Sequence, residues 1–248
     1  MNKEEQWLLN EKYKGVESFA FHADLERLRT GEPLAYIIGS IPFLGCTIHL
    51  DTHPLIPRPE TEFWVEEAIK TIQSTTLCES NPQILDLCAG SGAIGIAVAK
   101  AIPEVHVTFG EIDAKHMPII AKNLEANGID CTRYKVFASN LFENITGTYD
   151  FILTNPPYID PAIDRAEASV KTHEPHLALY GGSDGMEIIE KIIAQATEHL
   201  KNTGQLWIEH EPEQKEAIAK HGIDSGFIVT THTDQYQVPR YSVLRMAQ

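Results

Sequence analysis

The stretch "DLCAGSGAIG", residues 86–95, joins an apolar run to a glycine-rich turn and then to a second apolar run. Its glycines, Gly90, Gly92 and Gly95, satisfy the pattern G-x-G-x-x-G, in which a strand turns into a helix beside a bound cofactor. The pattern alone is a weak signal, because any tight strand-to-helix turn can carry these letters. The segments on either side therefore decide how it is interpreted.

Downstream of this turn, apolar runs with strand character alternate with longer runs of helical character. The expected strands are 83–88, 105–111, 133–138, 149–154, 204–209, 227–232 and 240–245. The expected helices are 93–101, 115–127, 185–200 and 213–221. This alternation predicts an α/β fold, with an open, mostly parallel sheet that helices cover on both faces. Ligands of such sheets bind beyond the carboxyl ends of the strands.

Upstream of the turn the pattern is different. Residues 17–30 predict a short helix that Gly31 and Pro33 end. The stretch "AYIIGSIPFLGCTIHLD", residues 35–51, alternates around glycine and proline and predicts a β-hairpin. A further helix is expected from Pro59, whose fixed φ suits a first helical turn.

Composition excludes several classes of protein. The 248 residues are 43% hydrophobic, with no run of 18 apolar residues, so a membrane span is not expected. The charged start, "MNKEEQWLLNEKYK", argues against secretion, and the four dispersed cysteines are expected to be reduced thiols in a cytoplasmic protein. No histidine or cysteine spacing suggests a metal site. A net charge of −15 favours solubility and opposes a broad nucleic-acid surface.

Acidic side chains at the strand ends indicate which cofactor the glycine-rich turn could bind. Asp86 is expected to face the ligand, where it would repel a pyrophosphate but attract the sulfonium and ammonium of S-adenosylmethionine. Glu111 ends the next strand and could accept the ribose hydroxyls; Asp113 is the competing candidate but is expected to cap the following helix. Asn140 could bond the adenine amine, although an ordinary loop turn explains it equally well. Leu141 or Phe142 could pack on the adenine ring.

The sequence "NPPY", residues 155–158, ends the strand over 149–154 because neither proline has an N–H to donate. The Asn155 side-chain oxygen and the Pro156 carbonyl can together accept both hydrogens of one planar NH₂ group. Tyr158 could pack against the flat group that carries it. The pattern therefore predicts methyl transfer to an amide or aromatic amine, driven by positioning and hydrogen bonding without a metal.

Several segments, in this order, resemble the HemK/PrmC-type release factor glutamine methyltransferases. They are "RTGEPLAYIIG", "LIPRPETE", "DLCAGSGAIGIAVA", "NPPYI" and "HEPHLALYGGSDG". The resemblance implies a Rossmann-like class I methyltransferase. Its seven-stranded, mostly parallel sheet has an antiparallel last strand and follows a short helical segment and a hairpin. It also implies a division at 1–34 (helical segment), 35–57 (hairpin linker) and 58–248 (methyltransferase domain).

The resemblance further implies transfer of a methyl group from S-adenosylmethionine to the glutamine of a Gly-Gly-Gln loop in a translation release factor. The residues that it assigns to the cofactor are Cys88, Ala89, Gly90, Ser91, Gly92, Glu111, Asn140 and Leu141, with Asn155 facing the methyl end. The residues that it assigns to the glutamine are Asn155, Pro156, Pro157 and Tyr158, and it places Arg58 to Glu62, with Arg58 and Glu60 as the substrate contacts, near the same site.

Three features depart from the family pattern. Cys88 stands where a glycine is common, and we expect that Cys88→Gly keeps methyl transfer but slightly lowers stability by raising unfolded-chain entropy. Glu111 stands in place of the usual aspartate. Only about 30 residues represent the N-terminal helical domain, which in the family helps to grip the release factor.

Other functions remain open at this stage. The substrate could be a glutamine in a ribosomal protein, or the exocyclic amine of adenine in nucleic acid, since "NPPY" is shared with enzymes of that kind. A non-enzymatic alternative is an interaction module that binds S-adenosylmethionine. The acidic chain shows neither the basic surface nor the target-recognition insert expected of an adenine methyltransferase.

Overall fold

Seven apolar segments form one sheet with the strand order β5-β4-β3-β6-β7-β9-β8. The structure, a computed structural model, describes residues 1–76, 81–163 and 165–247. The strands are β3 (Gln83–Leu87), β4 (His106–Glu111), β5 (Tyr134–Ala138), β6 (Tyr149–Thr154), β7 (Leu200–Glu209), β8 (Phe227–Thr233) and β9 (Pro239–Met246). Strands β3 to β7 pair in parallel, whereas β9 runs antiparallel to both β7 and β8. The predicted class I sheet with an antiparallel last strand is confirmed.

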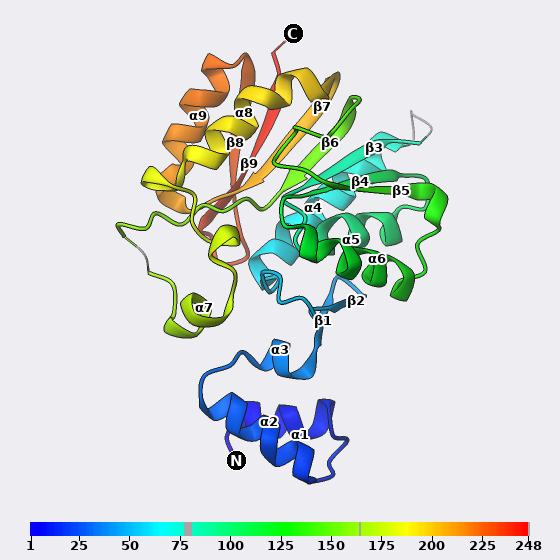
Figure 1. Ribbon diagram of the computed structural model, residues 1–248. Helices are drawn as coiled ribbons and strands as arrows, with labels where there is room; N and C mark the ends of the chain where they lie inside the picture. Colours follow the sequence, from blue (N-terminus) through cyan, green and yellow to red (C-terminus); the bar gives the residue numbers. More distant parts are fainter. Residues whose placement is uncertain (77–80, 164, 248) are drawn as a thin grey trace.

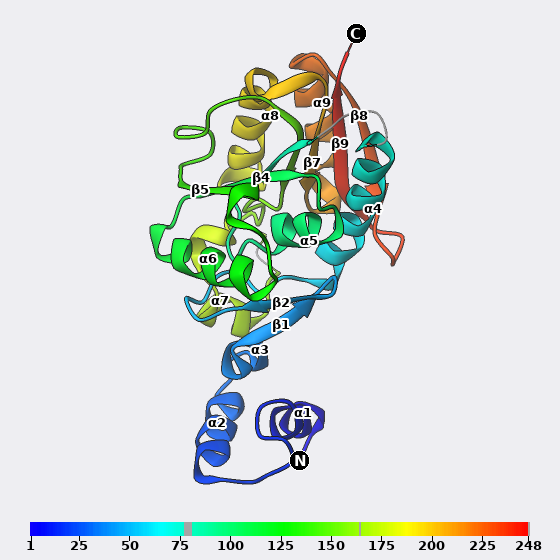
Figure 2. The same ribbon diagram turned by 90° about the vertical axis from the view of Figure 1, so that its right-hand side faces the viewer.

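Helices cover both faces of this sheet, as Figures 1 and 2 show. One face carries α4 (Pro59–Thr76), α5 (Ala93–Ala101) and α6 (Met117–Ala126), and the other carries α8 (Glu187–His199) and α9 (Lys215–Asp224). Each face has its own apolar core: Trp64 and Phe109 lie fully buried in the first, and Ile189 and Leu206 in the second. The near-continuous apolar character of β3 and β6 follows from this double coverage.

Ahead of the sheet lie α1 (Lys3–Glu11), α2 (Phe19–Arg29), α3 (Leu34–Ile38) and the hairpin of β1 (Ser40–Phe43) and β2 (Cys46–His49). The three helices share a small core around Leu8, Phe21 and Ile37. They project from the rest of the molecule at its amino-terminal end (Figure 1). The hairpin packs on α5 and α6, where the Asn123 amide bonds both the N–H and the C=O of His49. The division at residues 34 and 57 stays a proposal.

The sequence did not predict three short helices. Asn2 and Glu5 form a capping box that starts α1, and this signal was present in the sequence but not used. Helix α3 occupies residues that were expected to begin the hairpin, because Pro33 starts a single helical turn and Gly39 ends it with φ +91°. The third, α7 (Ala168–His173), lies in the long connection after β6.

Two predictions from composition, on the cysteines and on membrane-spanning helices, can be compared with the structure. Cys46, Cys88 and Cys131 are free thiols, and Cys78 lies outside the described residues. Over residues 1–76, 81–163 and 165–247, no helix has both the length and the apolar character needed to span a bilayer.

Candidate active site

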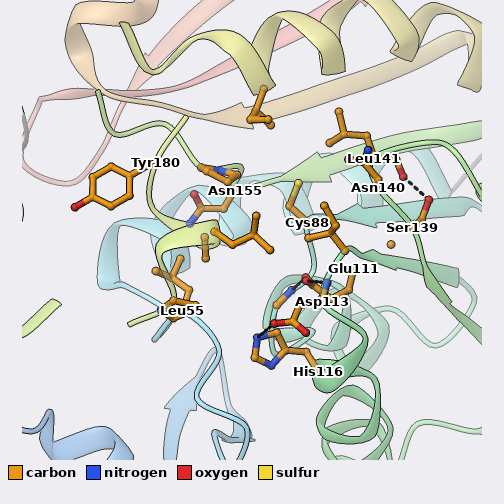
Figure 3. Close-up of a pocket in the computed structure, with 18 residues that line it drawn as sticks. Leu55, Cys88, Glu111, Asp113, His116, Ser139, Asn140, Leu141, Asn155 and Tyr180 are labelled. Atoms are coloured by element: carbon orange, nitrogen blue, oxygen red, sulfur yellow. Dashed lines mark hydrogen bonds and ion pairs between the residues drawn. The ribbon is translucent and has the colours of Figure 1, made fainter. Parts of the chain in front are cut away.

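The carboxyl ends of four neighbouring strands lie level with one another. The strand register pairs Leu87 of β3 with Gly110 of β4 and with Thr154 of β6, and it pairs Glu111 with Ala138 of β5. A cavity opens beyond these ends (Figure 3). The cavity is lined by Leu55, Cys88, Gly90, Gly110, Glu111, Ile112, Asp113, His116, Ser139, Asn140, Leu141, Asn155, Pro157, Pro175, Leu177, Ala178, Tyr180 and Ile188. It lies where ligands of open α/β sheets bind.

The glycine loop forms one wall by turning sharply between β3 and α5. Cys88, Gly90 and Gly92 all have positive φ, of +60°, +55° and +79°. A Cβ on Gly90 would meet nothing within 4 Å, so this residue leaves open space beside the cavity. Gly95 has another role: a Cβ there would lie 2.5 Å from the Phe109 ring, so this glycine allows α5 to pack closely on β4.

Asp86 does not line the cavity, which differs from the expectation that it faces the ligand. Its side chain is fully buried beneath the loop, where Oδ2 accepts a hydrogen bond from the Gly95 N–H at 2.8 Å. The other oxygen, Oδ1, is buried without a partner among the described residues. Burial raises the pKa of Asp86 well above its usual range, and the Gly95 N–H opposes this. Asp86 thus supports the loop from below.

Glu111 takes the position predicted for a ribose-binding acid. Its Oε2 accepts from the Gly90 N–H at 2.6 Å and its Oε1 from the Asp113 N–H at 2.8 Å, so it ties the loop to the end of β4. Burial raises its pKa, and these two N–H groups lower it. Asp113 caps the short helix at residues 114–116 through the Lys115 N–H, as predicted, but it lines the cavity as well.

After β5, the chain turns past the cavity at Asn140 and Leu141. Leu141 lies against the cavity with a φ of +50°, and the Ser139 hydroxyl holds this turn by donating to the Leu141 C=O at 2.7 Å. The exposed Asn140 amide donates to Glu143 at 2.9 Å. Phe142 does not line the cavity and stacks on His199 instead, so Leu141 is the better candidate for contact with an adenine ring.

The "NPPY" corner brings Asn155 and Pro157 to the cavity, whereas Pro156 is buried behind them. The Asn155 Nδ2 donates to Thr61 Oγ1 at 3.3 Å, and within the described part of the chain its Oδ1 has no partner. The placement of Tyr158 differs from the expectation of a substrate platform beside Asn155. Its hydroxyl donates to Glu209 at 3.0 Å, and its ring lines a second, neighbouring cavity.

The segment from Arg58 to Glu62 lies beside the corner, but not with the residues expected to touch substrate. Arg58 forms an ion pair with the buried Glu174, which also accepts from the Ile56 N–H at 3.0 Å. Neither Arg58 nor Glu60 lines a described cavity. Thr61 makes the contact with Asn155 instead.

The sequence analysis did not identify Glu209 or the chain over 175–180 that borders the cavity, and within the stretch from Arg58 to Glu62 it did not single out Thr61. Glu209 is 1% exposed and follows the apolar run of β7, the same signal that identified Glu111 after β4. Leu177 and Ala178 line the cavity, and a β-bridge between Ile159 and Tyr180 joins their segment to the chain that follows "NPPY". His116 also lines the cavity; burial lowers its pKa to about 4, so the ring is neutral.

Comparison with known proteins identifies the family. Residues 69–173 match the model of the methyltransferase small domain. The chain is 35% identical over 222 residues to the release factor glutamine methyltransferase of Bifidobacterium longum, covering 84% of this chain and 73% of the relative. It is 36% identical over 196 residues to the release factor glutamine methyltransferase of Rhodopirellula baltica, which covers 78% of this chain and 66% of the relative. The chain belongs to the release factor glutamine methyltransferase family.

This assignment confirms the predicted family, the enzyme class and S-adenosylmethionine as the methyl donor. The chain spans about two thirds to three quarters of the length of these two relatives. The fold has wider similarity: the human METTL16 catalytic domain in complex with the MAT2A 3′UTR hairpin 6 superposes with a TM-score of 0.63 at 16% identity. That match covers 82% of this chain and 76% of the other, and it supports the fold alone.

Proposed function

We propose that this methyltransferase transfers the methyl group of S-adenosylmethionine to the side-chain amide nitrogen of a glutamine in a translation release factor. The name of the relatives supports this substrate. The geometry supports it independently, because the corner after β6 presents acceptors for an NH₂ group. Release factors act where ribosomes end translation, so the proposed reaction belongs in the cytoplasm.

The residues around the first cavity fit S-adenosylmethionine. Gly90 leaves room for close approach of the backbone, and Glu111 and Asp113 line the same cavity with carboxyl groups that can accept the hydrogens of ribose hydroxyls. Each carboxylate oxygen has two acceptor positions, so Glu111 can hold its two backbone N–H groups and still accept hydroxyl hydrogens. When bound, the cofactor supplies a methyl group on a sulfonium, which is a good leaving group.

The observation that carries the substrate assignment is the orientation of Asn155. Its Nδ2 is held by Thr61, so its Oδ1 is left to accept a hydrogen bond at the edge of the cavity. The Pro156 C=O follows directly in the chain and has no N–H of its own residue beside it. Two acceptors on one NH₂ group orient its nitrogen and favour the pyramidal geometry that attack requires. This arrangement supplies rate by positioning and by hydrogen bonds preorganised for the transition state.

The alternative functions receive less support. The two relatives compared above are named for a release factor, and the net charge of −15 opposes binding to a phosphate backbone. A non-enzymatic module would have no need of a trap for an NH₂ group. We therefore propose a protein partner, the release factor, and no direct contact with nucleic acid.

The test is methyl transfer from labelled S-adenosylmethionine to four acceptors in separate reactions: a release factor, the same factor with the loop Gln changed to Ala, ribosomal proteins, and DNA. We expect label only in the unmodified release factor, with the same rate when a chelator is present. Label in the Gln→Ala factor at an equal rate would contradict the proposed target atom. Loss of activity with the chelator, restored by a divalent metal, would contradict the metal-free mechanism.

A further inference from the structure

A buried hydrogen-bond cluster joins the amino-terminal end of α4 to the corner after β6. At its centre is Glu209, the last residue of β7, whose side chain is almost fully shielded from solvent. Its Oε2 accepts from the Thr61 hydroxyl at 2.7 Å and from the Trp64 Nε1–H at 2.6 Å, and its Oε1 accepts from the Tyr158 hydroxyl at 3.0 Å. The cluster thus joins residues that are up to 148 positions apart in sequence.

The chemistry of these groups fixes the direction of each hydrogen bond. An indole N–H can only donate, so the oxygen that Trp64 contacts must be an acceptor. The same oxygen contacts Thr61. Burial raises the pKa of Glu209, and the hydrogen bonds from Trp64, Thr61 and Tyr158 lower it, so these three donors favour the ionised carboxylate, whose oxygens only accept. The hydrogen of the Thr61 hydroxyl is therefore directed at Glu209. Only the lone pairs of Thr61 Oγ1 remain to face Asn155.

The direction of the Thr61–Glu209 hydrogen bond also determines how the Asn155 amide is oriented. Because Thr61 Oγ1 can only accept from it, the Asn155 amide must turn its Nδ2 toward Thr61, at 3.3 Å. The opposite orientation would place two oxygens against each other with no hydrogen between them. Asn155 Oδ1 then points away from Thr61, and the cavity that Asn155 lines is where it can find a donor.

We propose that Glu209 is a positioning residue for methyl transfer: through Thr61, it fixes the Asn155 amide with its oxygen toward the substrate NH₂ group. Glu209 does not line the cofactor cavity, so it acts through these neighbours and not on the substrate itself. The bond from Tyr158 to the same carboxylate holds the far end of the corner in place. This inference rests on the proposed function, because it concerns how the acceptor for the substrate amide is oriented.

The kinetic test uses Thr61→Val, which keeps the shape of the side chain and removes the hydroxyl. We expect kcat to fall about 2- to 10-fold, the equivalent of one hydrogen bond, while the affinity for S-adenosylmethionine stays unchanged. Thr61→Ser should restore kcat. Thr71→Val, the same change on the same helix, is the matched control, because among the described residues the Thr71 hydroxyl bonds only the Glu67 C=O, at 3.0 Å. A Thr61→Val enzyme with wild-type kcat would overturn the proposal.

Double variants that include Asn155→Ala distinguish a positioning role of Glu209 from a general structural one. Glu209→Ala should lower kcat at least as much as Thr61→Val, and in an Asn155→Ala background neither change should lower it further. If the losses multiply, Glu209 and Thr61 act on something other than Asn155, and the proposal fails. Should Glu209→Ala fail to fold, the Thr61→Val and Asn155→Ala pair carries the same test.

A second readout does not depend on the substrate. The side-chain NH₂ of Asn155, assigned in a ¹⁵N NMR spectrum by its absence in Asn155→Ala, should be protected from exchange in the wild type and in Thr71→Val. It should lose protection in Thr61→Val. A protected Asn155 NH₂ in Thr61→Val would overturn the proposal even if the enzyme is active. Loss of protection in an enzyme that methylates no glutamine would reject the proposed function and leave the orientation intact.

Discussion

At the scale of single residues, Cys88 shows how the structure revises an expectation about stability. The sequence led us to expect that Cys88→Gly slightly lowers stability through unfolded-chain entropy. The φ of +60° at Cys88 adds an opposing effect, because a residue with a Cβ is strained in this region by about 1–2 kcal/mol. The relief of this strain exceeds the entropy difference of about 0.4–1 kcal/mol between glycine and alanine.

The prediction compares two variants that both lose the thiol. Cys88→Gly should be more stable than Cys88→Ala by about 0.5–1 kcal/mol, because only glycine relieves the left-handed backbone. Chemical denaturation of the cofactor-free protein measures the difference, and both variants should retain methyl transfer. A more stable alanine variant would show that Cys88 carries no such strain, and a large loss of activity in both would reveal a role for the thiol.

Glu111 allows a second prediction at this scale. Glu111→Ala should weaken binding of S-adenosylmethionine by about 1.5–3 kcal/mol, as expected for the loss of hydrogen bonds to a charged group. It also removes the acceptor that ties Gly90 to the end of β4. Calorimetry with Asp113→Ala as the comparison gives the test. If Asp113→Ala loses binding and Glu111→Ala does not, the ribose contact belongs to Asp113.

Individual site residues were predictable from sequence only where a local signal marked them. Asn155 directly follows β6, Glu111 ends β4 and Leu141 lies three residues after β5, and the structure brings all three to one cavity. Thr61 had no such signal, because its partner Glu209 lies 148 positions away in the chain. Tyr158 was assigned from the motif, and a local pattern could not show that Glu209 would hold its hydroxyl.

At the scale of elements, the chain over 174–180 is fastened to the hairpin linker by one carboxylate. Glu174 has a side chain that is 1% exposed, and it binds both the Arg58 guanidinium and the Ile56 N–H. This contact positions Pro175, Leu177 and Ala178 at the cavity. The carboxylate therefore couples the border of the site to the chain ahead of α4.

Glu174→Ala should lower the free energy of unfolding by about 1–3 kcal/mol, because it leaves a buried N–H and a partly buried guanidinium without their acceptor. Hydrogen exchange should become faster over residues 174–180. The control is Glu213→Ala, which breaks an exposed ion pair with Arg165 and should cost at most about 1 kcal/mol. Equal effects of the two changes would contradict the fastening role.

Elements were predicted well where hydrophobic periodicity was strong. The alternation after residue 83 gave each strand of the sheet and the helices that cover it, and their ends moved by only a few residues. Three helices were missed for different reasons: α3 and α7 have only five and six residues, α7 has no buried residue, and the capping box that begins α1 was not used. Their positions depend on contacts with other parts of the chain, which periodicity does not encode.

At the scale of the whole molecule, the chain combines an acidic net charge with a cavity that we propose to hold S-adenosylmethionine and a glutamine amide. The net charge of −15 opposes binding to a phosphate backbone, and the cavity at the strand ends is lined by the acidic residues Glu111 and Asp113. The order of the strands brings the cofactor loop after β3 beside the Asn155 corner after β6, because these two strands are neighbours. The topology therefore supplies the alignment of methyl donor and acceptor.

The central claim is that the Asn155 side-chain oxygen holds the substrate NH₂ group during methyl transfer. The most direct measurement is single-turnover transfer to the glutamine of a purified release factor by Asn155→Ala, with cofactor binding measured separately. We predict normal folding, unchanged affinity for S-adenosylmethionine and a rate that is lower by about 10²–10³, as for the loss of one preorganised hydrogen bond at a reacting centre. A rate near that of the wild type would show that "NPPY" only ends a strand.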